Sequence, residues 1–320
     1  MLTLAAIEDA AETVYRSMRP TPQYAWPLLA DAVGRKVWVK HENHTPTGAF
    51  KVRGGLVITS GIARNSPAGT GIISATRGNH GQSLAFASAR NGLACTIVVP
   101  HGNSAEKNAA MRAFGAELIE AGGDFDEAKQ HAMALADERG LLMVPSFHPD
   151  LVRGVATYAM EFFRAADDLD VVYVPIGLGS GICGMISARN LLGRRTRIVG
   201  VVSDKADAYA LSLESGQRVE TASAVTFADG MAVRGPDETA LAVIRAGVDD
   251  ILRVSDEAIA EAVRLLYRTT HSVAEGSGAA ALAALLQDQR RGEVAGIVLS
   301  GQNIDTAWMA EILAGGTPAA

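Results

Sequence analysis

The stretch V-V-Y-V-P-I-G-L-G-S-G, residues 171–181, indicates the fold more directly than any other part of the chain. An apolar run, 171–175, leads into a glycine-rich loop, 177–181, and then into a segment with helical spacing. Such a run is typical of a strand buried on both faces of a parallel sheet. Glycines there can turn several backbone N–H groups toward one point, where the helix dipole favours an anion. The stretch predicts a strand–helix unit with a phosphate-binding loop. A tight turn packed by glycine and a dinucleotide-binding fold are the alternatives.

Apolar runs alternate with segments of helical spacing along most of the chain. This alternation predicts a doubly wound α/β protein with right-handed crossovers. Ligands bind such sheets at the carboxyl ends of the strands. The expected strands are 37–40, 71–74, 94–99, 116–119, 141–144, 171–175, 197–202 and 296–300, and the expected helices are the N-terminal segment, 81–90, 104–114, 124–139, 153–164, 182–192 and 256–270, the last with Ser255 as N-cap.

Composition narrows the class of protein. The chain has 320 residues, enough for two domains, with 48% hydrophobic and 20% charged residues, as in a soluble globular protein. A net charge of -6 argues against a nucleic-acid partner, because phosphate binding needs a basic face. No apolar run is long enough to span a membrane, and the acidic N-terminal segment does not resemble a signal peptide. Cys95 and Cys183 do not form a disulfide framework, so a cytoplasmic location is expected.

Two further polar segments favour a ligand site. Lys51 lies in P-T-G-A-F-K-V-R-G-G, residues 46–55, just past a predicted β-hairpin. A lysine among turn-formers is either a solvated charge or an amine held in a cleft, where burial lowers its pKa. The polar loop S-A-T-R-G-N-H-G, residues 74–81, follows a predicted strand and opens a helix. Taken singly, Asn79 could be a helix cap, His80 a satisfied helix-start histidine and Ser300 a strand-end hydroxyl.

Four motifs in order resemble one enzyme family. A-F-K-V-R-G, G-N-H-G-Q-S, G-L-G-S-G and S-G-Q-N, spread over about residues 21–305, are similar to the fold-type II pyridoxal phosphate enzymes, within them to the serine/threonine dehydratase and serine racemase branch. The resemblance implies two open, twisted, mostly parallel sheets flanked by helices, as in the tryptophan synthase β subunit, with the active site between domains. A large domain is expected at 1–60 and 149–320, a small one at 61–148, and no C-terminal regulatory domain.

The resemblance also implies roles for individual residues. Lys51 would carry pyridoxal 5′-phosphate as a Schiff base and act as the catalytic base. Phe50 would pack near the pyridine ring, and Asn79 would bind the cofactor's 3-hydroxyl. Ser300 would face the pyridine nitrogen. The remaining expected contacts are the phosphate ligands Gly177, Gly179, Ser180 and Gly181, and the substrate-binding loop of Thr76, Arg77, Gly78, Asn79 and His80.

Two departures from the family pattern refine this reading. Arg77 replaces the serine that serves racemases as a second base, and a permanent cation cannot do so. The alternatives for Arg77 are a contact with the substrate carboxylate or a solvated charge. Val202 and Ala208 replace carboxylate ligands of the family's divalent cation site, so no metal is expected there, although Asp204 and Asp207 lie between them. Lys205 could supply the positive charge instead. His41, Glu42 and His44 are not expected to share a metal, because strand side chains alternate in direction.

The expected activity is α,β-elimination of water from an L-β-hydroxy-α-amino acid, giving a 2-oxo acid and ammonia. Threonine or serine is the default substrate, and 3-phenylserine or a hydroxyaspartate is an alternative. An amino-acid racemase, a β-replacement synthase and a non-enzymatic nucleotide-binding module are the competing hypotheses. The expected partner is a small amino-acid substrate, with no nucleic acid and no membrane, and the expected assembly is a homodimer.

Overall fold

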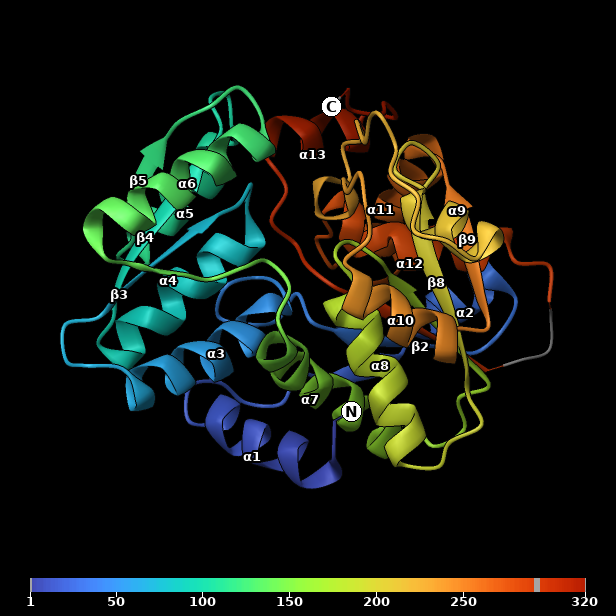
Figure 1. Ribbon diagram of the computed structural model, residues 1–320. Coiled ribbons are helices and arrows are strands. Elements are labelled where there is room, and N and C mark those ends of the chain that lie inside the picture. The colour runs from blue at the N-terminus through green and yellow to red at the C-terminus, as the bar shows by residue number, and fades with distance from the viewer. Residues whose placement is uncertain (1, 291–293, 320) are drawn as a thin grey trace. The chain divides into compact units, whose positions relative to one another are not determined.

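The computed structural model describes residues 2–290 and 294–319, and the described chain forms two compact units (Figure 1). The first unit takes Pro20–His44 and the described part of Ala156–Ala320, together with residues 2–4. The second takes Ala5–Arg19 and Thr45–Val155. Helix α7 (Pro149–Ala165) carries the chain from the second unit into the first.

The first unit is built on a sheet with strand order β1-β2-β10-β7-β8-β9. Strand β1 runs antiparallel to β2, and the other neighbours are parallel. The strands are β1 (Gln23–Ala25), β2 (Val37–His41), β7 (Val171–Pro175), β8 (Arg197–Ser203), β9 (Asp250–Val254) and β10 (Ala295–Leu299). The apolar runs predict β2, β7, β8 and β10 to within a residue or two. They do not predict β1 or β9, because these edge strands are short or carry charged side chains.

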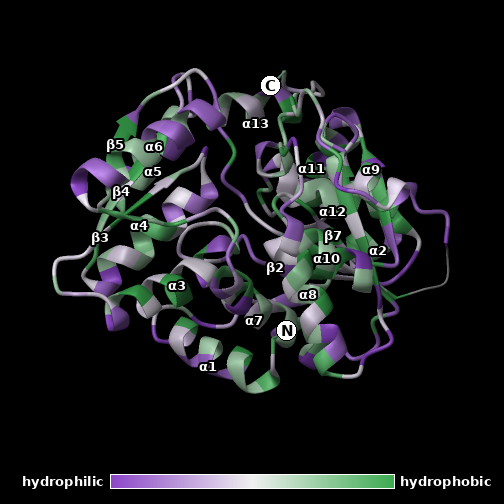
Figure 2. Cartoon of the chain, in the orientation of Figure 1, coloured by the Kyte–Doolittle hydropathy of each residue, from purple (hydrophilic) through white to green (hydrophobic). Residues whose placement is uncertain are grey.

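Helices cover this sheet, and buried side chains of the helices and strands together form the core of the first unit. Helix α12 packs across β7 to β10, and its buried small side chains allow close approach. Both α12 and β7 are largely green in Figure 2 because their side chains are apolar. Ser255 caps α11 as predicted, accepting a hydrogen bond from the backbone N–H of Ala258. The helices are α2 (Pro27–Val33), α8 (Ser180–Leu191), α9 (Ala208–Ser215), α10 (Glu238–Gly247), α11 (Asp256–Thr270), α12 (Gly276–Gln287), α13 (Thr306–Leu313) and the short η1 (Asp229–Met231).

The second unit has a parallel sheet with strand order β5-β4-β3-β6. Helix α4 packs on β4, and α6 packs on β3 and β4. The strands are β3 (Gly71–Ala75), β4 (Ala94–Val99), β5 (Glu117–Glu120) and β6 (Leu142–Met143), and the helices are α1 (Leu4–Tyr15), α3 (Lys51–Asn65), α4 (Asn79–Asn91), α5 (Ala105–Ala113) and α6 (Phe125–Arg139). The predicted α/β class, with mostly parallel sheets flanked by helices, is confirmed.

The second unit extends beyond the expected small domain of 61–148. Helices α1 and α3 belong to it, because Ala10 and Val14 of α1 and Val52 and Leu56 of α3 share one buried cluster with Phe86 of α4. Composition does not record this packing, so the domain boundaries expected from the sequence differ from the boundaries of the two units.

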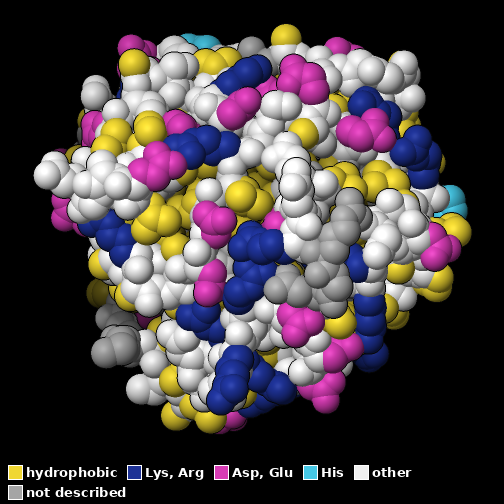
Figure 3. Space-filling view, turned by 90° about the vertical axis from the view of Figure 1, so that its right-hand side faces the viewer, with side chains coloured by type: hydrophobic (Ala, Val, Ile, Leu, Met, Phe, Trp, Pro, Cys, Tyr) yellow, Lys and Arg dark blue, Asp and Glu magenta, His cyan; other side chains and the backbone are white. Residues whose placement is uncertain are grey.

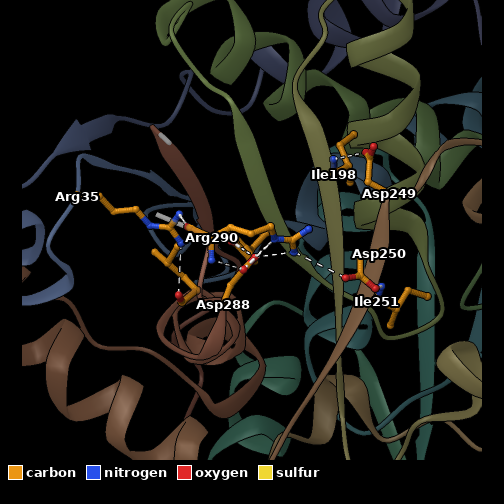
Figure 4. A network of polar contacts seen from close by, with 9 residues as sticks. Arg35, Ile198, Asp249, Asp250, Ile251, Asp288 and Arg290 are labelled. Atoms are coloured by element: carbon orange, nitrogen blue, oxygen red, sulfur yellow. Dashed lines mark hydrogen bonds and ion pairs between the residues drawn. The ribbon is translucent and has the colours of Figure 1, made fainter. Parts of the chain in front are cut away.

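The amino ends of the first unit's strands are tied together by charged side chains (Figure 4). Arg290 donates to both carboxylate oxygens of Asp288, and the Tyr173 hydroxyl donates to Asp288 at 2.6 Å. Arg35 donates to the Arg290 carbonyl at 2.6 Å. These interactions hold the pKa of the Asp288 carboxyl well below its usual range against the effect of burial. The network therefore lies at the amino edge of this sheet, opposite the carboxyl edge at which ligands bind in doubly wound sheets.

On the face shown in Figure 3, Lys and Arg side chains are interspersed with Asp and Glu. This face does not form a continuous basic surface of the kind that binds nucleic acid. Within the described residues, the helices are all too short or too polar to cross a membrane.

Candidate active site

Lys51 is the first residue of helix α3 in the second unit. The predicted β-hairpin before it is wrong, since α2 lies between the antiparallel strands β1 and β2. Gly54 and Gly55, which follow Lys51 among the turn-forming residues, lie inside α3. A Cβ on Gly54 would lie 2.8 Å from the Leu151 carbonyl oxygen, and one on Gly55 would lie 2.2 Å from the Ser83 hydroxyl. These glycines therefore serve helix packing.

The packing of α3 on α4 fixes the position of Lys51. Ser83 of α4 donates its hydroxyl to the Lys51 carbonyl at 2.6 Å. The Lys51 side chain is half-buried, and its Nζ lies 5.0 Å from the centroid of the Phe50 ring. The Phe50 ring therefore lies beside the amine, where an aromatic face favours a cation.

The substrate-binding loop expected from the sequence, residues 76–80, connects β3 to α4. Thr76 is buried, and its hydroxyl accepts the backbone N–H of Gly78 at 3.2 Å. Gly78 is the N-cap residue, and no side chain caps the helix. The first N–H groups of a helix lack partners within it, so this end of α4 can receive an anion. Asn79 begins the helix and is not its cap, which removes the cap explanation for this residue.

His80 and Lys51 lie close enough to interact electrostatically. The His80 side chain is buried, and its Nε2 has no hydrogen-bond partner in the described structure. Burial, and then the charge of Lys51, lower the pKa of His80 to about 3. The imidazole is therefore neutral at physiological pH and can exchange a hydrogen bond with a bound group. Arg77, in the same loop, is exposed.

The glycine loop lies in the first unit, between β7 and α8. Gly177 approaches the backbone so closely that a Cβ would lie 2.2 Å from the Gly230 carbonyl oxygen. Gly179 has φ +98°, where side chains other than glycine's are strained, and it caps α8 without a side-chain hydrogen bond. Ser180 and Gly181 form the first turn of α8. The predicted strand–loop–helix unit is thus present, with an uncapped helix N-terminus suited to a phosphate.

Two tyrosines that the sequence patterns do not indicate hold this loop. The Tyr209 hydroxyl donates to the Leu178 carbonyl at 2.9 Å, and the Tyr158 hydroxyl donates to the Gly181 carbonyl at 3.3 Å. Burial raises the pKa of Tyr209, so its hydroxyl stays protonated and remains a donor. Tyr158 comes from α7, the helix before β7, and Tyr209 comes from α9, which follows β8. No local sequence pattern marks either tyrosine as a partner of the loop.

Ser300 follows β10, the neighbour of β7 in the sheet. The glycine loop and Ser300 therefore leave the carboxyl ends of adjacent parallel strands. The buried Ser300 hydroxyl donates to the Ser277 carbonyl at 3.2 Å. Gly230 packs against both the glycine loop and the partner of Ser300. Its carbonyl oxygen lies against Gly177, and a Cβ on Gly230 would lie 2.6 Å from the Ser277 hydroxyl.

The segment 202–208, where no metal is expected, contains side chains that form ion pairs. Lys205 Nζ lies 2.8 Å from Asp256, and Arg253 Nε lies 2.8 Å from Asp207. His41 and His44 stack with ring centroids 5.1 Å apart, so the expectation that they point apart is wrong, because β2 ends at His41 and the chain turns. Among the described residues, no three His, Cys, Asp or Glu side chains are grouped as metal ligands.

These features fit a phosphorylated aldehyde cofactor. The uncapped glycine loop offers backbone donors to a phosphate, and Lys51 offers an amine beside an aromatic ring. The loop 76–80 adds a second anion site and a buried imidazole with an unsatisfied nitrogen. The first unit thus carries a loop suited to a phosphate, and the second carries an amine and a second anion site.

Comparison with known proteins agrees with this chemistry. The chain is 34% identical to the biosynthetic L-threonine dehydratase of Salmonella typhimurium over 91% of its own length, and it spans only 58% of that enzyme. It is 30% identical to the L-threo-3-hydroxyaspartate ammonia-lyase of Saccharomyces cerevisiae, covering 98% of this chain and 97% of that enzyme. The structure of threonine deaminase isoform 2 from Solanum lycopersicum superposes with a TM-score of 0.89 at 30% identity, covering 97% of this chain and 88% of that one. The model of the pyridoxal-phosphate dependent enzymes matches residues 14–301, and the chain belongs to this family.

Proposed function

We propose that the protein is a dehydratase (ammonia-lyase) that removes water from an L-β-hydroxy-α-amino acid and releases a 2-oxo acid and ammonia. The observation that carries this proposal is the pairing of Lys51 with the loop 76–80 in one unit. The start of α3 and the anion-binding end of α4 pack together, since Ser83 of α4 donates its hydroxyl to the Lys51 carbonyl at 2.6 Å. A base and a carboxylate site in such proximity suit proton removal at the Cα of an amino acid.

The motifs assign the cofactor ligands. Lys51 would hold the aldehyde carbon, Asn79 would bind the 3-hydroxyl, and Phe50 would pack near the pyridine ring. Ser300 would face the pyridine nitrogen. The phosphate ligands would be Gly177, Gly179, Ser180 and Gly181. Pyridoxal phosphate, when bound, supplies an electrophilic carbon for amines and a ring that withdraws electrons from Cα.

The chain's own groups then direct the reaction. The N-terminus of α4 binds the substrate carboxylate through backbone N–H groups of its first turn. Lys51 Nζ, freed when the substrate amine takes its place on the aldehyde, would remove the Cα proton as a general base. Loss of the β-hydroxyl as water gives an enamine, which hydrolyses to the oxo acid and ammonia. Arg77 cannot act as a base on the other side of Cα, which disfavours racemisation.

Three related properties belong to the same proposal. The enzyme acts in the cytoplasm, in keeping with the buried, unpaired Cys95 and Cys183. It works as a homodimer, the commonest assembly and the one this family favours. It needs no divalent cation at residues 202–208, because Val202 and Ala208 offer no ligand oxygen in their side chains and Lys205 places its ammonium there.

Replacing Lys51 tests the proposal. Lys51→Ala should lower oxo-acid release at least about 100-fold, since a positioned general base contributes that much or more. Lys129→Ala, an exposed lysine of α6, is the matched control and should retain the parent rate. The assay follows oxo acid from threonine, serine, 3-phenylserine and 3-hydroxyaspartate.

Other products would replace this proposal. Loss of substrate chirality without oxo acid would indicate a racemase, and incorporation of added sulfide into an activated serine would indicate a β-replacement synthase. A parent protein that binds nucleotides and gains no absorbance near ~410–420 nm with pyridoxal phosphate would indicate a nucleotide-binding module.

A further inference from the structure

A buried carboxylate connects three segments of the first unit at the carboxyl ends of β8 and β9. Asp256 is the first residue of α11, which follows β9, and its side chain is 3% exposed. One of its oxygens lies 2.8 Å from Nζ of Lys205, which follows β8 and has a side chain that is 53% exposed. The other oxygen accepts a hydrogen bond from the buried Thr226 hydroxyl. Both oxygens of this carboxylate therefore hold segments that are distant in the sequence.

Thr226 connects Asp256 to the segment that packs against the glycine loop. The Thr226 hydroxyl also accepts the backbone N–H of Ala228 at 3.1 Å, which fixes the turn that leads into η1. Gly230 lies within η1, and its carbonyl oxygen would lie 2.2 Å from a Cβ on Gly177. The surroundings of Gly177 therefore depend on the segment that Thr226 holds.

Lys205 connects Asp256 to a second segment that contacts the same loop. Lys205 lies in the turn that leads from β8 into α9. Tyr209, in the first turn of α9, donates its hydroxyl to the Leu178 carbonyl. Asp256 thus joins the segment that contacts Gly177 to the segment that precedes the contact with Leu178.

The ion pair and the hydrogen bond depend on each other. A buried carboxylate is costly unless it is paired with a cation and hydrogen-bonded. The hydrogen bond to Asp256 and the charge of Asp256 raise the pKa of Lys205, so its ammonium group stays protonated. Removal of Lys205 alone would leave a buried carboxylate without its cation, whereas removal of both charges would leave no such group.

We propose that Asp256 and Lys205 are positioning residues for the phosphate group of the cofactor. They hold the two segments that contact the glycine loop, and they act through that loop rather than by touching the phosphate. This inference rests on the cofactor site of the function proposed above. It requires that both residues affect the binding of pyridoxal phosphate more than that of pyridoxal, which lacks the phosphate.

A double-mutant cycle tests this inference. Lys205→Ala should raise the dissociation constant for pyridoxal phosphate about tenfold, since the carboxylate loses its cation. Asp256→Asn should raise it by a similar factor, because an amide has one oxygen for two donors that approach different oxygens of the carboxylate. The double variant should bind within about threefold of the parent, since neither charge is left unpaired. Spectroscopic titration measures both compounds, and the constant for pyridoxal should change less than about twofold in every variant.

Two further substitutions isolate the Thr226 hydroxyl. Thr226→Ser keeps the donor and should bind pyridoxal phosphate as the parent does, whereas Thr226→Val removes it and should weaken binding about tenfold. Lys36→Ala is the matched control for the ion pair. Lys36 pairs with Asp168 at 2.5 Å at the amino edge of the same sheet, so its loss should leave both dissociation constants unchanged.

Three results would overturn the inference. They are parent-like binding by both single variants, purely additive effects in the double variant, and equal weakening of pyridoxal and pyridoxal phosphate. A parent that binds pyridoxal phosphate no more tightly than pyridoxal would also overturn it, because the glycine loop would then not hold the phosphate. Oxo-acid release by the parent tests the dehydratase function separately, so the failure of one proposal is distinguishable from the failure of the other.

Discussion

At the residue scale, the buried His80 makes stability depend on pH. Its pKa is about 3 in the folded chain and 6.5 in an unfolded one, so the folded state favours the neutral form. The resulting stabilisation is complete above pH 6.5 and is lost as pH falls toward 3. Between pH 6.5 and pH 5 the free energy of unfolding should decrease by about 2 kcal/mol from this residue. His80→Asn should remove that part of the decrease in urea unfolding.

A control separates this effect from general acid sensitivity. His131 lies exposed on α6, and His131→Asn should keep the parent's pH dependence. Burial and nearby positive charge also lower the pKa of His41, in the first unit, to about 4. His41 therefore adds to the loss of stability at low pH, and it remains in both variants. A His80→Asn protein as acid-sensitive as the parent would contradict the assignment.

Residues differ in how well sequence predicts them. The four motifs single out Lys51, Asn79, the glycine loop and Ser300 through their resemblance to one enzyme family. Their proposed ligand contacts are still predictions. The contacts of Tyr209 and Asp256 depend on how distant segments pack, and no local pattern records this.

At the element scale, the glycine loop depends on a tyrosine from α9. The Tyr209 hydroxyl donates to the Leu178 carbonyl and accepts the backbone N–H of Asp237 at 3.3 Å. Tyr209→Phe removes both interactions, so the dissociation constant for pyridoxal phosphate should rise about tenfold. The constant for pyridoxal, which lacks the phosphate, should change little. Spectroscopic titration measures both.

An exposed tyrosine gives the matched control. Tyr267 lies on α11, and Tyr267→Phe should bind both compounds as the parent does. Equal weakening of pyridoxal and pyridoxal phosphate by Tyr209→Phe would show that the tyrosine does not act through the phosphate loop.

Helix α3 shows why some elements escape sequence patterns. Gly54 and Gly55 look like turn signals after Lys51, yet both lie within a helix, because α4 and α7 pack too closely for a side chain. Continuous apolar runs, by contrast, predict the central strands, since burial on both faces leaves a local record. Packing between elements leaves no such local record in the sequence.

At the scale of the whole molecule, cofactor binding should stabilise both units. Each unit has its own core, and the motifs assign Lys51 to one and the glycine loop to the other. Pyridoxal phosphate at about 100 times its dissociation constant stabilises the folded state by about 2.7 kcal/mol. At roughly 2 °C per kcal/mol for a chain of this size, the thermal midpoint should rise by about 5 °C.

Variants in either unit should lose most of this rise if one cofactor uses groups from both. Lys51→Ala removes the amine, and Gly177→Ala places a Cβ 2.2 Å from the Gly230 carbonyl oxygen and distorts the loop. Gly61→Ala, on α3, is the matched control, because its added Cβ meets nothing within 4 Å. Thermal unfolding with and without pyridoxal phosphate, followed by circular dichroism, measures the shift. If Gly177→Ala keeps the full shift while Lys51→Ala loses it, the cofactor does not depend on the glycine loop, and the phosphate site must lie elsewhere.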